Sequence, residues 1–122
     1  MRDTNLALRA DGAAALTADD LTPAWVDFGS GDINPMTYQL VVPAAGGTTP
    51  TLLAVIQEAE DASGTGARAV LTFEPITAAG IFYVTGRMDG RFRRLTLDVG
   101  GTTPDFGSVE CYPILNGDYT EF

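Results

Sequence analysis

GIFYVTGRMDGRFRRLTLDVGGTTPDFG, residues 80–107, is the stretch around which we organise the predicted fold. Apolar and polar residues alternate on both sides of Asp89-Gly90, a dipeptide suited to the two positive φ angles of a type I′ turn. If these two residues form the loop, apolar side chains oppose one another on a single face. The opposed pairs are Val84 with Leu95 and Phe82 with Leu97. Because a slip of one residue would set apolar against polar residues, the pattern predicts a β-hairpin with this register.

Residues 52–61, LLAVIQEAED, fit both a helix and a strand. Each structure would gather apolar side chains on one face, so periodicity alone does not decide between them. We favour the strand, because the neighbouring segments alternate as strands do and the turn-rich SGTG at 63–66 leads into another alternating run at 67–75. The sequence therefore predicts a second hairpin here.

Further alternating runs fill the rest of the chain. In residues 24–28 we expect Val26 and Phe28 to face inward and Trp25 and Asp27 outward. Other strands are expected at 6–8, 36–42 and 108–115. About eight or nine short strands joined by Gly-, Pro- and Asp-rich connections predict an all-β, antiparallel β-sandwich, with a jelly roll as the expected topology. We expect one domain over residues 1–122, ending in a polar tail at 116–122.

Charge and length exclude several function classes. The chain has 122 residues, with sixteen acidic and seven basic residues, no histidine and a net charge of −9. A negative surface repels phosphate backbones, so we expect no nucleic-acid partner. The beginning of the sequence has no apolar signal segment, and no run approaches 18 apolar residues, so we predict neither secretion by a signal peptide nor a membrane partner.

The only cysteine, Cys111, excludes an intrachain disulfide. It lies in a strand-like run without a neighbouring basic residue that would lower its pKa. We therefore predict a buried, unreactive thiol.

The absence of histidine and lysine leaves carboxylates as the remaining catalytic groups. A glycosidase would need a pair of them, and the candidates are Glu58 with Glu60, or a pair among Glu74, Asp98 and Glu110. These residues alternate with apolar residues along strands, which is typical of the solvated face of a sheet. We predict that the protein is not an enzyme and uses no cofactor.

Two loops contain oxygen ligands that suit calcium. One holds Asp27, Asp32 and Asn34, and the other holds Asp61 and Ser63. Neither has the spacing of an EF-hand, and Asp and Asn are common turn formers. We favour turns over a metal site.

Four of the seven arginines fall between Arg87 and Arg94. In the predicted hairpin, Arg91 and Arg93 share the face of the core residues and Arg94 lies on the other face. Two interpretations stand equally. The arginines pair with nearby carboxylates, or they mark a contact surface, since arginine is enriched at protein interfaces.

The pentapeptide GGTTP occurs twice, at 46–50 and 100–104, each time after an apolar strand. Glycine supplies positive φ and proline stops a strand, so we favour two similar loops over an internal duplication.

Residues 91–104, RFRRLTLDVGGTTP, resemble the capsid cement, or head decoration, proteins of tailed bacteriophages, which have a comparable aromatic-x-Arg-Leu strand running into a Gly-Gly-Thr loop. Further similarities follow in the same order, namely NLAL at 5–8, VDFG at 26–29 and AAG at 78–80. The resemblance extends over roughly residues 4–115.

The resemblance implies a jelly-roll protein without catalysis that sits as a homotrimer on the outside of an icosahedral head. Its partners would then be the major capsid protein and further copies of itself, and its location the exterior of the virion after synthesis in the host cytoplasm. Exposed aromatic residues and arginines anchor interfaces. As interface residues we predict Trp25, Arg91, Arg93, Arg94, Tyr119 and Phe122.

The alternative function is a carbohydrate-binding β-sandwich module. It would need Trp25 and a tyrosine coplanar on one exposed face. The candidate tyrosines are Tyr38, Tyr83 and Tyr112.

Overall fold

A computed structural model describes residues 6–10, 12–28 and 35–114, and these residues form an all-β structure without an α-helix. The seven strands are β1 (Val26–Asp27), β2 (Met36–Val42), β3 (Gly46–Ala59), β4 (Arg68–Thr72), β5 (Gly80–Gly86), β6 (Phe92–Asp105) and β7 (Glu110–Ile114). Within the described ranges no helix has the length and apolarity needed to cross a membrane.

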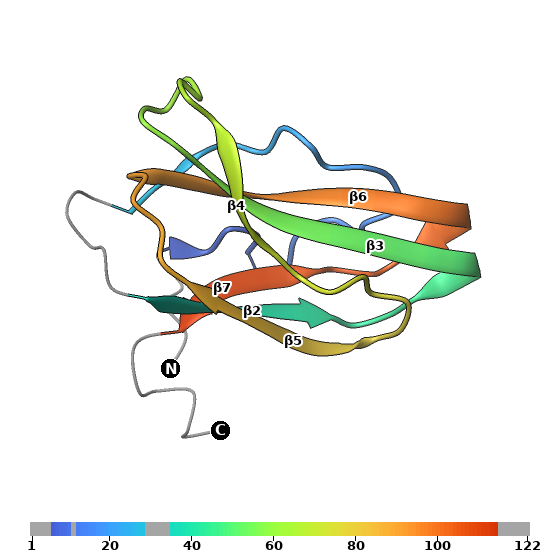
Figure 1. The fold of residues 1–122 in the computed structure, drawn as a ribbon. Helices are drawn as coiled ribbons and strands as arrows, with labels where there is room; N and C mark the ends of the chain where they lie inside the picture. The colour runs from blue at the N-terminus through green and yellow to red at the C-terminus, as the bar shows by residue number, and fades with distance from the viewer. Residues whose placement is uncertain (1–5, 11, 29–34, 115–122) are drawn as a thin grey trace.

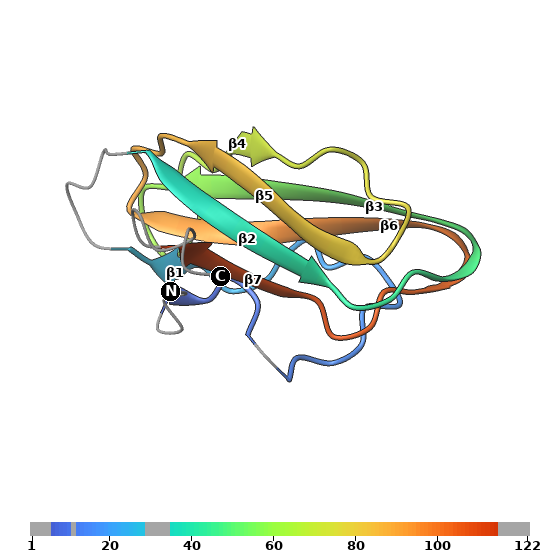
Figure 2. The ribbon, with the colours of Figure 1, turned by 90° about the horizontal axis from the view of Figure 1, so that it is seen from below.

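The strands form two antiparallel sheets that face each other (Figures 1 and 2). One sheet has four strands in the order β1-β6-β3-β4, and the other has three in the order β5-β2-β7. The long strands β3 and β6, with 14 residues each, run side by side through the first sheet. This confirms the all-β, antiparallel prediction.

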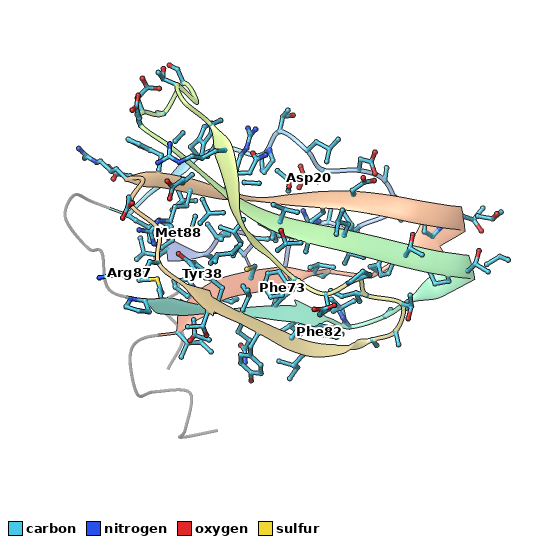
Figure 3. The ribbon with its side chains drawn as sticks, viewed as in Figure 1. Asp20, Tyr38, Phe73, Phe82, Arg87 and Met88 are labelled. Carbon is cyan, nitrogen blue, oxygen red and sulfur yellow. The ribbon has the colours of Figure 1, made fainter. Side chains whose placement is uncertain are left out.

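One apolar core fills the space between the sheets. Alternate residues of each strand point into it, as the period of a β-strand requires. Figure 3 shows Tyr38, Phe73 and Met88 in this space, and each is at most 2% exposed. Burial of an apolar side chain of this size stabilises a fold by about 1.5–3 kcal/mol, so this core is the main source of stability.

The predicted hairpin at 80–98 is wrong. Strand β5 pairs with β2, whereas β6 pairs with β3, so the two segments belong to different sheets. Residues 87–91 connect the sheets (Figure 1), and neither Asp89 nor Gly90 has the positive φ of a type I′ turn. Phe82 and Leu97 still meet the same core, but from opposite sheets. In this stretch the alternation identified the apolar residues that face the core, Phe82, Val84, Leu95 and Leu97. It could not show whether the two strands lie side by side in one sheet or opposite each other in two.

Other predicted elements are confirmed. Residues 52–59 belong to strand β3, which pairs with β4 as the predicted second hairpin, with a bulge between Ile56 and Gln57. Val26 and Phe28 pack against the core. The expected first strand at 6–8 is not formed; instead Arg9 makes an isolated antiparallel bridge to Cys111 of β7, whose N–H donates to the carbonyl of Arg9 at 2.9 Å. The seven assigned strands are therefore fewer than expected, and the tail at 116–122 lies outside the described residues.

The two GGTTP segments are paired strand ends rather than separate loops. They form the ends of β3 and β6 farthest from the crossing at 87–91 (Figure 1). The residue pairs are Gly46 with Asp105, Thr48 with Thr102 and Thr51 with Gly100. A local twofold rotation exchanges the two copies. It moves Gly46 onto Gly100 and Asp105 onto Thr51, so that one of these pairs becomes the other. We call residues 46–51 and 100–105 the threonine ribbon.

Corresponding residues of the threonine ribbon have the same backbone conformation. Gly47 and Gly101 have φ of 97° and 106°, and Thr49 and Thr103 have φ of 47° and 46°. Each of these two threonines donates its hydroxyl to the preceding carbonyl at 2.8 Å. Positive φ at a β-branched residue costs on the order of 1–3 kcal/mol. The repeated pentapeptide therefore encodes two matching bulges that pair with each other.

A glycine substitution tests the pairing of the ribbon. A Cβ at Gly101 would lie 2.7 Å from the carbonyl oxygen of Thr49, so Gly101→Ala combines a backbone collision with an unfavourable φ. We expect a loss of at least about 3 kcal/mol in the free energy of unfolding measured with urea. Gly12→Ala is the control, since Gly12 has φ of 83° with open space around it; it should cost only about 1–2 kcal/mol. Equal losses for the two variants would contradict the paired ribbon.

Candidate interaction surface

The outer face of the four-stranded sheet carries a tryptophan fixed by polar neighbours. Trp25 precedes β1, and the guanidinium carbon of Arg94 lies 4.2 Å from the centroid of its ring. Arg94 points outward because its neighbours in β6 are buried, and its Nε donates to Oε1 of Gln57 at 2.9 Å. A cation–π contact at an exposed site stabilises by about 0.5–1 kcal/mol. The arrangement orders two side chains that are costly to immobilise when a partner binds.

Arg91 and Asp27 form a bidentate ion pair on the same face. Nε of Arg91 donates to Oδ1 of Asp27 at 2.7 Å, and Nη2 donates to Oδ2 at 2.8 Å. The side chains remain 52% and 43% exposed. The hydrogen bond to Asp27, and secondly its negative charge, raise the pKa of Arg91. We call Trp25, Asp27, Gln57, Arg91 and Arg94 the arginine face.

Arg93 is not part of this face, because its side chain points into the core and is 4% exposed. Its guanidinium donates to the hydroxyl of Tyr38 at 2.7 Å and to the carbonyl oxygens of Met88 and Gly90, both at 3.2 Å. It also lies 4.6 Å from the ring centroid of Phe28. The prediction that Arg93 contributes to an exposed interface is therefore corrected. The predicted hairpin put Arg93 on the core face, and the structure shows that this face is covered by the opposite sheet.

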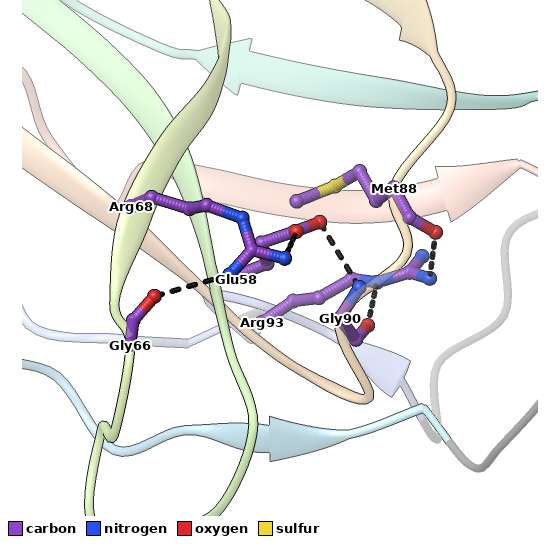
Figure 4. A network of polar contacts seen from close by, with 6 residues as sticks. All are labelled: Glu58, Gly66, Arg68, Met88, Gly90 and Arg93. Carbon is purple, nitrogen blue, oxygen red and sulfur yellow. Dashed lines mark hydrogen bonds and ion pairs between the residues drawn. The ribbon is translucent and has the colours of Figure 1, made fainter.

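Glu58, in β3, binds the same connection between the two sheets, residues 87–91, which we call the crossing segment. Its Oε1 accepts the N–H of Gly90 at 3.1 Å, and its carboxylate forms an ion pair with Arg68 (Figure 4). Gly90 must be glycine for lack of space, since a Cβ there would lie 2.6 Å from Cβ of Glu58. We call Glu58 and Arg93, which grip residues 88–90, the crossing clamp.

Sequence reasoning missed the crossing clamp, although one signal for it was present. Glu58 lies on the same inward side of β3 as Leu52, Ala54 and Ile56, and a carboxylate at a core position needs a charged or hydrogen-bonding partner. The sequence does not identify Arg68 as that partner, because Arg68 lies opposite Glu58 only as a result of the bulge in the β3–β4 pairing.

Substitution of adjacent arginines separates the clamp from the arginine face. Arg93→Met should lower the free energy of unfolding by at least about 3 kcal/mol, because it leaves the buried carbonyls of residues 88 and 90 and the Tyr38 hydroxyl without their donor. Arg94→Met, on the exposed side of the same strand, should change it by less than about 1 kcal/mol. Denaturant unfolding of both variants measures the difference. A small effect of Arg93→Met would show that the clamp is not stabilising.

The remaining aromatic candidates lie elsewhere. Tyr38 and Tyr112 are at most 2% exposed, and Tyr83 lies 48% exposed on β5 of the other sheet. Among the described residues, no tyrosine therefore shares the exposed face of Trp25. The predicted interface residues Tyr119 and Phe122 lie outside the described part of the chain.

The carboxylate candidates are distributed over the molecule. Asp98 lies on β6 and Glu110 on β7, in different sheets, and Glu74 is exposed after β4. Glu58 is held by Gly90 and Arg68 in the core, whereas Glu60 is exposed.

The calcium candidates have other partners where the structure describes them. Asp27 binds Arg91, and Oδ1 of Asp61 accepts the N–H groups of Ser63 and Thr65 at 2.9 and 3.2 Å. Hydrogen bonds from Thr65, followed by those from Ser63 and Gly64, lower the pKa of Asp61. Asp32 and Asn34 lie outside the described residues. No group of three or more Cys, Asp or Glu side chains suited to a metal ion occurs in residues 6–10, 12–28 and 35–114.

Cys111 is fully buried, as predicted, and burial raises the pKa of its thiol. We expect no reaction with a thiol reagent in the folded protein at pH 8 and complete reaction in denaturant, because the thiolate forms only after unfolding. Absorbance of the released chromophore measures both. Rapid labelling of the folded protein would contradict the burial.

Comparisons of the chain with protein-family models, with curated proteins and with solved structures give no match.

Proposed function

We propose that the protein is a non-enzymatic structural protein that binds the outside of an icosahedral phage head as a trimer and stabilises contacts between major capsid subunits. The observation that carries the proposal is the arginine face. An acidic chain with net charge −9 holds Trp25, Arg91 and Arg94 in fixed positions on one outer sheet face. Arginine and tryptophan are the residue types most enriched at binding hot spots.

The order of segments supports a jelly-roll topology for this protein. We count the bridged segment 8–9 and the seven strands as eight segments in chain order. One sheet then contains the first, eighth, third and sixth segments, and the other the second, seventh, fourth and fifth. A ribbon of four antiparallel segment pairs rolled into two sheets has this order, and viral capsid domains use this architecture.

Different parts of the surface would serve the two kinds of partner. The arginine face would bind the major capsid protein, where acidic or carbonyl groups offer acceptors for the two guanidinium groups. The threonine ribbon, with exposed threonines at one end of the sheet pair, would contact other copies in the trimer. The protein would be made in the host cytoplasm and end on the capsid exterior. The resemblance of residues 91–104 to cement proteins supports the same assignment.

Binding to phage heads that lack the protein tests the proposal. The purified protein should be a trimer by light scattering, co-sediment with the heads and raise their resistance to heat. Arg91→Gln combined with Arg94→Gln should weaken head binding at least about tenfold, because it removes the charge-assisted donors of the arginine face.

Arg87→Gln is the matched control. Arg87 is exposed in the crossing segment, outside the arginine face, so its loss should leave head binding unchanged. A protein that remains monomeric and ignores heads would overturn the proposed function, and binding of glycans by such a protein would favour the carbohydrate-binding alternative.

A further inference from the structure

Strand β5 is an open edge of the three-stranded sheet. Among the described residues it pairs only with β2, whereas β7, at the other edge, is bridged by residues 8–9. Figure 2 shows β5 along one side of the sheet, with β2 on its other side. Among the described residues, the backbone donors and acceptors of β5 that point away from β2 therefore have no strand partner.

Strand β5 itself carries none of the sequence features that usually protect an edge from pairing. Edge strands of soluble proteins commonly carry charges, proline or a bulge. Residues 80–86, GIFYVTG, contain no charged residue and no proline, and their pairing with β2 is regular throughout. Ile81 and Tyr83 on the outer face are 57% and 48% exposed, two of the most exposed large apolar side chains in the described residues.

Two copies of β5 can pair with each other in antiparallel orientation with matching residues opposed. Pairing centred on Tyr83 opposes glycine with glycine, the inward residues with each other and the outward residues with each other. The opposed pairs are Gly80 with Gly86, Ile81 with Thr85, Phe82 with Val84, and Tyr83 with Tyr83 of the second copy. Each face then continues from one molecule to the next, as antiparallel pairing requires.

We propose that β5 is a homotypic docking strand, at which a second copy of this chain pairs antiparallel across a twofold axis through Tyr83. The contact would join two three-stranded sheets into one of six strands. It would set Ile81 and Tyr83 of each copy beside outward-facing residues of the other and satisfy the open backbone groups.

Charge favours a second copy as the occupant. Two chains of net charge −9 repel each other, and this repulsion is weakest where neither surface carries acidic groups. The uncharged strand β5 provides such a place, and the register centred on Tyr83 sets Arg87, the nearest charged residue, against Ala79. A register centred on Val84 would set Arg87 against Ile81, and a slip of one residue would set inward Phe82 against outward Tyr83.

The inference is independent of the proposed function. A twofold contact also agrees with a trimer on a phage head, because neighbouring trimers on a closed icosahedral shell face each other across twofold axes.

Disulfide trapping tests both the contact and its register in the full-length protein. Opposed residues of antiparallel strands have Cα atoms about 4.5–5.5 Å apart, within the range that a disulfide bridges. Tyr83→Cys should therefore form a covalent dimer on mild oxidation, read on a non-reducing denaturing gel. Buried Cys111 does not interfere.

Thr85→Cys is the matched control for register. Its two copies would lie four residues apart along the strands, about 13 Å, and should give no dimer. Adding Ile81→Cys to Thr85→Cys should restore a dimer, because these two positions are opposed. A dimer from Thr85→Cys alone, or none from Tyr83→Cys, would overturn the proposed pairing.

Sedimentation velocity provides a second measurement without cysteine. Tyr83→Lys sets two positive charges against each other at the axis and should weaken self-association at least about tenfold. Leu53→Lys makes the same kind of change at an apolar residue that is 41% exposed on the other sheet, and should have no effect. Equal effects of the two variants would contradict the assignment. If Tyr83→Cys forms the covalent dimer but the protein does not bind phage heads, the proposed function is overturned and the pairing of β5 stands.

Discussion

The hydrogen bonds from Arg93 and Glu58 to the backbone of residues 88–90 fix the point at which the chain passes from one sheet to the other. Both side chains are at least 96% buried, and each binds the backbone of the crossing segment. A buried charge is tolerated only when its hydrogen-bonding groups are satisfied, so the segment and the two side chains specify each other's positions. If the segment turned back as a hairpin, β5 would lie beside β6 and the two sheets could not enclose the core.

The clamp also explains how neighbouring arginines take different roles. Arg93 and Arg94 differ by one position in β6, and the period of a strand sends one into the core and the other onto the outer face. The inner arginine stabilises the crossing, and the outer one stacks on Trp25 beside the ion pair of Arg91 with Asp27. Arg91 therefore fits the first interpretation of the arginine cluster, because it pairs with a carboxylate, whereas Arg93 binds carbonyl oxygens and a hydroxyl inside the core.

The alternating pattern of the sequence predicted where most of the strands lie, but it did not predict which strands pair with each other. Strand β2 and the β3–β4 hairpin were predicted, but the strand face expected in residues 52–59, with Leu53, Val55 and Gln57, is the outer one. Leu52, Ala54 and Ile56 point inward instead, and residues 52–59 form a strand because these inward residues fill the core. The hairpin at 80–98 failed, since β5 and β6 have compatible patterns but better partners in β2 and β3, which are distant in sequence. The same limit hid the pairing of the two GGTTP segments, because each resembles an ordinary turn when it is considered alone. On the candidate site, Trp25 and Arg94 lie on the predicted outer face, whereas Arg91, which the predicted hairpin placed on the core face, is 52% exposed beside Asp27. The partners Asp27 and Gln57 could not be predicted, because they depend on strand register.

Hydrogen exchange at the amide of Gly90, measured by NMR on the folded protein, tests the crossing clamp most directly. This N–H donates to buried Glu58, so it opens only when the clamp opens. We predict protection close to that of the core amides of β3 and β6, corresponding to global unfolding. If the Gly90 amide exchanges as fast as those of the exposed loop at 61–66, the clamp is contradicted and residues 87–91 are an ordinary surface turn.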